Sequence, residues 1–262
     1  DLMMGLVGSE MCIRDRWRRT TPIVLQILLG CAGVILCWRI FLEKEKSKTI
    51  GRTIIVSKVL LHPGYFPSIS TFVALAKASH VVFETGDHFQ KQTHRNRMYI
   101  YSPNGLQLLN VPIKHVKEGH QKMRDVRLET AFDWQKQHFK SLEAAYRTSP
   151  FFEYFEDDLR PIFEKKHEFL WDLNYQTLEI VSHCLGLDFP YEETEEYHKE
   201  VTDVLDFRYL IQGKKDPTLI EPYVQVFGDK HGFLNNLSIL DLLFNEGRRA
   251  LDYLQRQSLA GL

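Results

Sequence analysis

The chain has 262 residues, enough for one large domain or two small ones. An apolar content of 44% and a charged content of 26% are typical of a globular protein and exclude a disordered chain. The formal net charge of −1 argues against a dedicated nucleic-acid-binding protein, which usually carries a strong basic excess.

The first 52 residues differ from the rest of the chain. Residues 1–16 show no periodicity, and the string GLVGSEMCIRDR resembles translated sequencing-adapter DNA, with a flexible tail as the alternative. Residues 22–42 are mainly apolar, at the short limit for spanning a bilayer, and a secretory signal or translated upstream DNA are the other interpretations. We expect residues 1–52 to be a non-native or disordered extension that includes, if residues 22–42 are native, a short transmembrane helix.

The next segment has the pattern of a βαβ unit. The β-branched run Thr53–Leu61 predicts a buried strand, and the following HPGYFPS predicts a turn. Ser70 is expected to cap a helix over Thr71–Ala78, and His80–Glu84 predicts a second strand. Strand, tight loop, helix and strand in this order are typical of a parallel sheet.

The chain then changes to a hairpin pattern. Arg97–Tyr101 and Leu106–Pro112 are apolar runs separated by SPNG, and Asn-Gly is the strongest short signal for a β-hairpin. Met123–Leu128 is expected to add an edge strand.

From Asp133 onward the pattern is helical. DWQKQHFKSLEAAYR carries apolar side chains at three- and four-residue spacings, and Gly186 is well placed to terminate a helix. The acidic run Tyr191–Glu200 is expected to be a solvated loop or a helix start. Further helices are predicted over Asp157–Phe169, Asn174–Leu185 and Ser238–Gln255.

These patterns predict an α/β fold in which a mixed sheet from the N-terminal half, the βαβ unit plus the hairpin, packs with a mainly helical C-terminal half. No internal repeat is visible, so residues 53–262 are expected to form a single domain. Among the four cysteines only Cys184 lies in this domain, which fits a reducing compartment, and its apolar neighbours predict a small buried side chain.

The turn after the first strand is the first candidate site. Ligands of α/β sheets collect at the carboxyl ends of strands, so His62 and Tyr65 are expected to face a crevice there. A rigid turn, with Pro63 and Pro67 restricting the backbone, is the alternative interpretation.

The second candidate site is basic. Between Gln90 and Arg127 the sequence has eight Lys or Arg residues and two acidic residues, an excess of six positive charges. Such an excess suits phosphate or carboxylate groups, although a solvated face balanced by the acidic second half is the alternative. Its candidate substrate-binding residues are Lys91, Arg95, Asn96, Arg97 and Lys114.

A third candidate lies on the helix that begins near Asp133. Trp134 and His138 share a face at a four-residue spacing, and Tyr146 follows on the same helix. His138 is either a functional imidazole or a hydrogen-bonded interior histidine. No metal is expected, because the histidines are scattered and no HxxxH or CxxC pairing exists.

Together these segments resemble the bacterial WbqC-like family. The similarity runs through HPGYFPSISTFVALAKASHVVFE, FQKQTHRNRMYIYSPNGLQLLNVPIK and DWQKQHFKSLEAAYRTSPFFEYF, and resumes weakly at YVQVFGDKHGFLNNLSILDLLFNEG. The N-terminal 52 residues depart from the pattern. The matching residues are His62, Tyr65, Pro67, Lys91, Arg95, Asn96, Arg97, Pro112, Lys114, Trp134, His138, Tyr146, Ser149 and Pro150.

The resemblance implies a cytoplasmic bacterial protein, often linked to O-antigen or other surface-polysaccharide synthesis, and an enzyme without an established mechanism. We therefore predict a transferase acting on a nucleotide-linked sugar or another phosphorylated or carboxylated metabolite. Its catalytic base is His62 or His138, an imidazole that titrates near neutral pH, and Asn96 orients a hydroxyl or carbonyl.

Two other functions stay open. One is a non-catalytic binding or assembly protein that uses the same basic residues to hold a charged ligand or partner. The other is a membrane-anchored accessory factor, which requires residues 22–42 to be native. The sequence names no cofactor, and a nucleic acid is not an expected partner.

Overall fold

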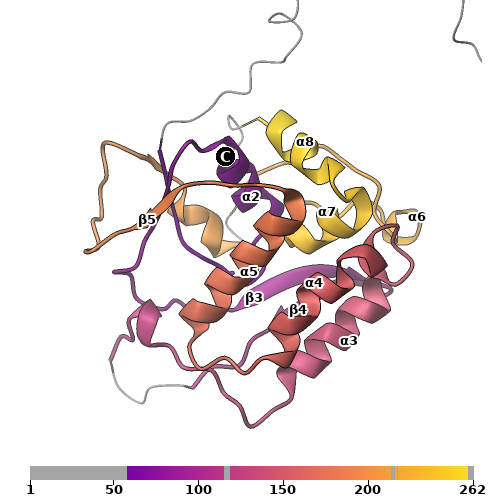
Figure 1. The fold of residues 1–262 in the computed structure, drawn as a ribbon, viewed down its shortest axis with the longest axis horizontal. Coiled ribbons are helices and arrows are strands. Elements are labelled where there is room, and N and C mark those ends of the chain that lie inside the picture. Colours follow the sequence, from indigo (N-terminus) through magenta and orange to yellow (C-terminus); the bar gives the residue numbers. More distant parts are fainter. Residues whose placement is uncertain (1–57, 115–118, 214–215, 217, 259–262) are drawn as a thin grey trace, which may run out of the picture. The chain divides into compact units, whose positions relative to one another are not determined.

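The computed structural model describes residues 58–114, 119–213, 216 and 218–258 (Figure 1). Residues 53–57 of the first predicted strand, the extension over residues 1–52 and the apolar segment 22–42 lie outside the described residues. Element labels follow Figure 1. None of the helices within the described ranges has both the length and the apolar character needed to cross a bilayer.

A four-stranded parallel sheet combines strands from both halves of the chain. Its strands are β1 (Val59–Leu61), β2 (Val81–Phe83), β5 (Tyr191–Glu193) and β6 (Leu205–Asp206), in the spatial order β5-β2-β1-β6. All three pairings are parallel, and α2 (Ile69–Lys77) makes the connection from β1 to β2. The predicted βαβ unit is confirmed, and the central strands are buried, as their entirely apolar sequences VLL and VVF suggest.

The sequence pattern predicts neither outer strand: β5 begins the acidic run that is expected to be a solvated loop or a helix start, and β6 lies in a stretch for which no element is predicted. Both are exposed and polar, YEE in β5 and LD in β6, so no apolar alternation marks them. Backbone hydrogen bonds hold them instead, including Val81 N to Pro190 O at 2.9 Å and Phe207 N to Leu60 O at 3.0 Å. The prediction for the first part of the acidic run is therefore wrong, because pairing with distant strands decides the structure there.

The antiparallel hairpin is confirmed and forms a separate two-stranded sheet. Its strands are β3 (Arg97–Ser102) and β4 (Gly105–Asn110), and Gly105 turns the chain with a φ of 96°. The edge strand predicted at 123–128 is wrong, since Met123–Asp125 is a short 3₁₀ helix. Among the described residues near it, the pairing consists of isolated bridges, one of them Ile113 to Leu128.

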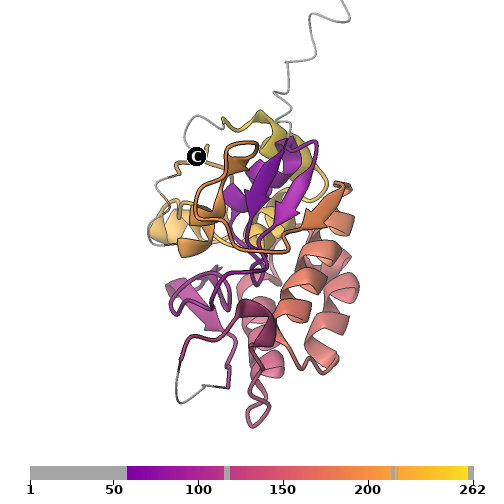
Figure 2. The same cartoon turned by 90° about the vertical axis from the view of Figure 1, so that its left-hand side faces the viewer.

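Three helices lie side by side after the hairpin (Figures 1 and 2): α3 (Trp134–Tyr146), α4 (Phe152–Glu164) and α5 (Leu170–Leu185). The predicted helix over 157–169 begins too late and ends too late. The real one starts after the Ser149–Pro150 step, and extended backbone at Lys165 ends it. Gly186 ends α5 in the left-handed conformation, as expected.

The C-terminal region contains α6 (Gly228–His231), α7 (Ile239–Glu246) and α8 (Arg249–Arg256). The predicted continuous helix over 238–255 is thus two helices, because Gly247, with a φ of 60°, breaks the run. Ser238 caps α7, while at α2 the cap position is Ser68 and the predicted cap, Ser70, lies inside the helix.

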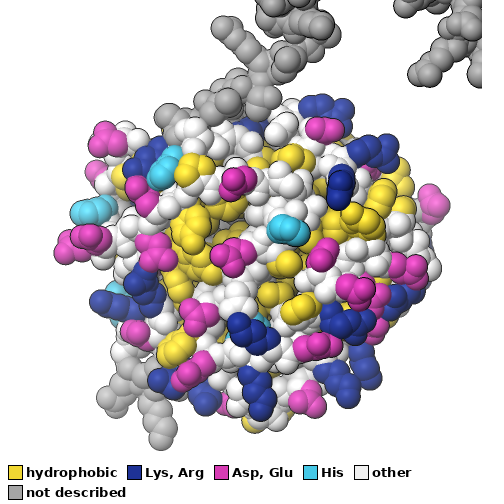
Figure 3. Space-filling model, viewed as in Figure 1, with side chains coloured by type: hydrophobic (Ala, Val, Ile, Leu, Met, Phe, Trp, Pro, Cys, Tyr) yellow, Lys and Arg dark blue, Asp and Glu magenta, His cyan; other side chains and the backbone are white. Residues whose placement is uncertain are grey.

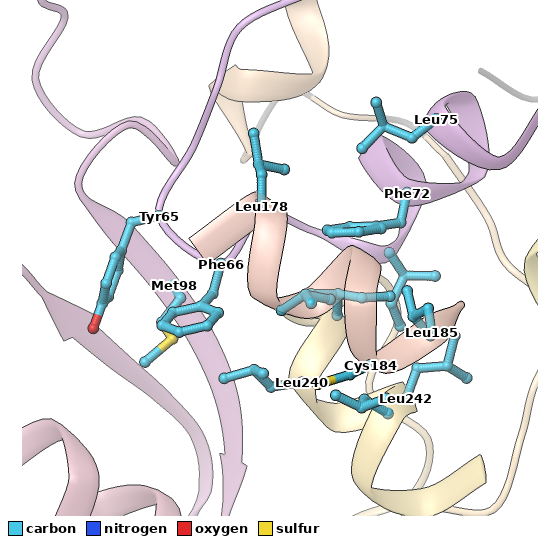
Figure 4. Close-up of a cluster of buried hydrophobic side chains, with 14 of the residues drawn as sticks. Tyr65, Phe66, Phe72, Leu75, Met98, Leu178, Cys184, Leu185, Leu240 and Leu242 are labelled. Carbon is cyan, nitrogen blue, oxygen red and sulfur yellow. The ribbon is translucent and has the colours of Figure 1, made fainter. Parts of the chain in front are cut away.

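The core brings these segments together. Figure 4 shows one cluster of buried side chains that includes Phe66 of the turn after β1, Phe72 of α2, Leu178 of α5 and Leu240 of α7. Cys184 is 7% exposed within this cluster, which confirms its predicted role as a small buried group, and burial raises the pKa of its thiol to about 12. The α/β class predicted from the sequence is confirmed.

Candidate functional site

His62 stands directly after β1, at the carboxyl end of the parallel sheet. A hydrogen bond to the backbone of Glu84, which follows β2, holds one side of its ring. On the other side, Nε2 lies 3.3 Å from Nη2 of Arg95 and 3.4 Å from Oδ2 of Asp87. Two neighbouring strand ends and the loop after β2 therefore fix the imidazole, as the rule for ligand sites in parallel sheets predicts.

The contact with Arg95 determines the protonation state of His62. A guanidinium only donates hydrogen bonds, so Nε2 is the acceptor and the proton of the neutral ring is on Nδ1. Burial and then the positive charges of Arg95 and Arg208 hold the pKa of His62 well below its ordinary value. At neutral pH the ring is thus an uncharged base with its lone pair directed toward Arg95.

A cavity of about 240 Å³ adjoins this imidazole. Its walls come from the ends of β1 and β6 and from the loops that follow β2 and β5, so it lies at the carboxyl edge of the sheet. We call it the His62 cavity. It is lined by His62, Asp87, Gln90, Arg95, Tyr197, Asp206, Arg208, Tyr209, Ile211 and Gln212.

Arg95 is one of the most deeply buried charged groups in this cavity, with 1% of its area exposed. Its Nη2 forms an ion pair with Asp87, and its Nη1 lies 3.4 Å from Oγ1 of Thr93. The Nε–H group has no acceptor within the described residues. Arg95 therefore keeps one unused donor, where an anionic or carbonyl oxygen is the partner it lacks.

Arg208 holds the opposite wall. Its guanidinium binds both carboxylate oxygens of Asp206, lies 3.3 Å from Oε2 of the buried Glu84, and donates to the carbonyls of His198 and Lys199. These bonds hold the acidic segment after β5 against the strand ends. The sequence pattern gave no sign of this, because the role of Arg208 depends on β6.

The turn that bears His62 and the segment that bears Arg95 are joined by the backbone and by α5. Tyr65 N donates to His94 O at 3.0 Å. Asn174 of α5 donates to the carbonyls of both Pro63, at 3.2 Å, and Arg95, at 2.9 Å. The expected convergence of these two segments is therefore observed in the described residues.

The basic residues after Arg95 line a different hollow, of about 420 Å³. The predicted single site is split: Arg95 faces the His62 cavity, whereas Lys91, Asn96 and Arg97 line this second hollow, which we call the Asn96 hollow. Lys114 is exposed and lines neither. The lining residues are Phe89, Lys91, Gln92, Asn96, Arg97, Asn110, Val111, Pro112, Ile113, Glu129 and Phe132.

The expected positive excess is partly neutralised by ion pairs. Arg124 pairs with Glu193, and Arg127 pairs with Glu168. On the face shown in Figure 3, basic and acidic side chains are interspersed. On that face the basic side chains do not form a broad positive surface.

The third candidate group lies in the interior. The Tyr65 hydroxyl and His138 Nδ1 are 3.0 Å apart, Trp134 packs edge-on against both rings, and burial lowers the pKa of His138 to about 4. None of the three lines either hollow. This arrangement favours the interior histidine that the sequence left open as an alternative.

Tyr146 belongs to a separate buried network. Its hydroxyl accepts from the backbone N–H of Tyr101 at 3.0 Å and donates to Oδ1 of Asp241 at 2.8 Å. Oδ2 of this fully buried carboxylate accepts from Tyr223 and from Gln225. The network ties α3, β3 and α7 together, and Tyr146 lines neither hollow.

The model of the WbqC-like protein family matches residues 62–215, more than half of the chain. The chain belongs to the WbqC-like family. The matched range contains all residues that line the His62 cavity and the Asn96 hollow. A relative in Mycobacterium tuberculosis, the uncharacterized protein Rv1507c, is 27% identical over 232 residues, covering 75% of this chain and 96% of the relative. No solved structure matches.

In this WbqC-like protein, His62 is a neutral imidazole whose Nε2 accepts from Arg95, and its lowered pKa makes it a weak base at rest. A histidine can act as a base only where its lone pair reaches the proton that it removes. Sequence reasoning placed His62 and Arg95 together. It missed Glu84, Asp87 and Arg208, whose roles depend on strand pairing.

The described residues contain no set of side chains arranged to bind a metal ion. Within residues 58–114, 119–213, 216 and 218–258, no group of three His, Cys, Asp or Glu side chains is arranged to hold an ion. The charged groups around His62 are engaged in ion pairs with one another instead.

Proposed function

We propose that this WbqC-like protein is a transferase-type enzyme in which His62 is the general base and the substrate is phosphorylated or carboxylated. The single observation that supports this most is the Nε2 lone pair of a neutral imidazole, held in a cavity at the sheet edge beside an arginine with an unused donor. Such a pairing suits removal of a proton and stabilisation of the charge that results.

The proposed step runs as follows. The substrate hydroxyl replaces Arg95 Nη2 as the hydrogen-bond donor to Nε2 of His62, and Nε2 accepts its proton as the hydroxyl oxygen forms a bond to the transferred group. The bond between this group and its donor breaks, and the donor leaves with the electron pair. Arg95 binds an anionic oxygen through Nε–H, while Lys91 and Arg97 hold a further acidic group of the substrate in the Asn96 hollow.

The family resemblance supports the biological setting of this proposal. It favours a cytoplasmic enzyme of surface-polysaccharide or related metabolite synthesis, with a nucleotide-linked sugar as the leading substrate class. His138, Tyr65, Trp134 and Tyr146 support the fold around the cavity in this proposal, and His138 is not the base.

A direct test compares His62→Gln with His183→Gln, which alters an exposed histidine on α5. Each protein is incubated with a mixture of UDP-sugars and phosphorylated or carboxylated acceptors, and products are followed by mass spectrometry. We expect the wild type and His183→Gln to form product and His62→Gln to lose about 10²–10⁴-fold in rate. A full rate in His62→Gln rejects the proposed base.

The alternative of a non-catalytic binding protein predicts a different result. A compound would then bind and stay unaltered in every variant, and binding would weaken in Arg97→Gln but not in His62→Gln. Isothermal titration with UDP-glucose, run beside the product assay, distinguishes the two functions.

A further inference from the structure

The Asn96 hollow has a mixed charge. Lys91 and Arg97 are positive, Glu129 is negative, and carboxamides from Asn96 and Asn110 lie among them. Oε1 of Glu129 already accepts from the backbone of Thr130 and Ala131. The hollow thus favours a ligand that is an anion overall, and it contains acceptors as well as donors.

Hydrogen bonding fixes which way the two carboxamides face. Arg97 Nε lies 3.1 Å from one side-chain atom of Asn110, and because a guanidinium only donates, that atom is Oδ1. One side-chain atom of Asn96 lies 2.9 Å from the carbonyl of Val111, and because a carbonyl only accepts, that atom is Nδ2. Nδ2 also donates to Asn110 Oδ1 at 3.1 Å.

This assignment leaves Oδ1 of Asn96 without a donor among the described residues. The side chain lines the hollow and is only 6% exposed, so water does not readily satisfy it. A buried acceptor without a partner is destabilising, and such a group calls for a specific explanation. The partner it lacks is a hydroxyl or amine proton, since a ligand carbonyl has none to give.

We infer that the Asn96 hollow binds a phosphorylated or carboxylated compound that also carries a hydroxyl or amine donor close to its anionic group. This rests on the proposed function and narrows its substrate. Lys91 and Arg97 neutralise the anion, and Oδ1 of Asn96 accepts from the neighbouring donor. Phe89, Pro112, Ile113 and Phe132 provide apolar wall for a carbon skeleton.

Two matched probes test the inference without any substitution. Glycerol 3-phosphate and n-propyl phosphate have the same charge and a three-carbon skeleton, but only the first has hydroxyl donors. By isothermal titration we expect glycerol 3-phosphate to bind about tenfold tighter, the factor that one additional hydrogen bond to a buried acceptor gives.

Substitutions then show which residues bind the phosphate and which cause the preference for glycerol 3-phosphate. Lys91→Gln should weaken both phosphates, whereas Lys136→Gln, an exposed lysine on α3, should weaken neither. Asn96→Ala should bring the two affinities together, provided its thermal unfolding shows a folded protein. If it unfolds, the comparison of the two phosphates on the wild type still decides whether the protein prefers an anion that carries a hydroxyl donor.

The outcomes separate the two proposals. Equal binding of both phosphates by the wild type overturns the donor preference and leaves the anion site of the proposed function standing. Binding of neither phosphate overturns both the preference and the anion site. A folded Asn96→Ala variant that still binds glycerol 3-phosphate more tightly than n-propyl phosphate, by the wild-type factor, would show that another residue causes the preference. That result would overturn the role of Asn96.

Discussion

Nη2 of Arg95 lies 3.3 Å from Nε2 of His62, so a group that only donates fixes the imidazole as an acceptor. The same Nη2 is ion-paired with Asp87. The arginine therefore stands between a carboxylate and an imidazole, and it opposes protonation of His62 although a carboxylate oxygen lies 3.4 Å from the ring.

This relationship predicts how His62 titrates. In the wild type its pKa is well below 6.5, so its imidazole NMR signals should stay those of the neutral ring as the pH falls through that value. Arg95→Met removes a positive charge and leaves Asp87 unpaired, so the pKa of His62 should rise. Lys91→Met, which alters the other hollow, should not change it. Equal titration in Arg95→Met and the wild type would contradict this account.

His138 predicts a pH-dependent stability. Its pKa is about 4 in the folded protein, against an ordinary 6.5, so between these values the unfolded chain binds a proton that the folded one does not. Stability from this group is present above pH 6.5 and falls by about 3 kcal/mol as the pH drops to 4. Urea denaturation of the wild type and His138→Gln should show a difference in unfolding free energy that shrinks over this interval. A constant difference would show that His138 does not contribute.

Gly86 predicts a tight approach between the loop after β2 and the segment after β5. A Cβ at this position would lie 2.6 Å from the backbone nitrogen of Tyr197, so Gly86→Ala must displace that segment. We expect destabilisation of about 1–3 kcal/mol, measured by thermal unfolding. Gly228→Ala is the control, because nothing lies within 4 Å of its added Cβ. Equal melting temperatures for the two variants would refute the prediction.

Removal of the Asp241 carboxylate should cause a large loss of stability. Asp241→Ala leaves the hydroxyls of Tyr146 and Tyr223 and the amide of Gln225 without their buried acceptor. We expect an unfolding free energy lower by about 3 kcal/mol, measured in urea. Asp229→Ala, an exposed position on α6, should change it little. A loss below 1 kcal/mol, roughly the worth of one ordinary hydrogen bond, would show that the network is not a structural unit.

Cys184 predicts an inert thiol. It is 7% exposed, and burial raises its pKa to about 12, so it should resist alkylation by iodoacetamide at pH 8 in the native protein. Peptide mass spectrometry should find the Cys184 peptide unmodified, and fully modified after denaturation in guanidinium chloride. Rapid native alkylation would show that this part of the core opens readily.

The βαβ unit and the hairpin could be predicted from the sequence because their signals are local. VLL and VVF are apolar runs typical of buried strands, and Asn-Gly is typical of a hairpin turn. The proximity of His62 and Arg95 could also be predicted, because ligand sites of α/β sheets form at the carboxyl ends of the strands. Strand β5 could not be predicted, because it depends on pairing with a distant part of the chain, as between Glu193 and Phe83. A polar segment fixed by remote backbone pairing has no periodicity to read.

The same limit explains the candidate residues. Spacing placed Trp134 and His138 on one helix face but did not show whether that face was interior or open. The sequence predicts one clamp from Lys91, Arg95 and Arg97, but Arg95 lies in a turn before β3 and lines the His62 cavity, whereas Lys91 and Arg97 line the Asn96 hollow. The direction of a side chain in an irregular turn has no periodicity from which it could be predicted. Arg208 became visible only when β6 placed it beside Glu84.

The late position of β5 and β6 has a consequence for biosynthesis. During translation β1 and β2 leave the ribosome long before the two outer strands that pair with them, so both flanks of the nascent sheet stay unpaired while the intervening helices are made. Unpaired strand edges promote aggregation, and distant pairing slows folding. A chain truncated before residue 190 would therefore accumulate in inclusion bodies, and it would also lack the residues after β5 and β6 that line the His62 cavity.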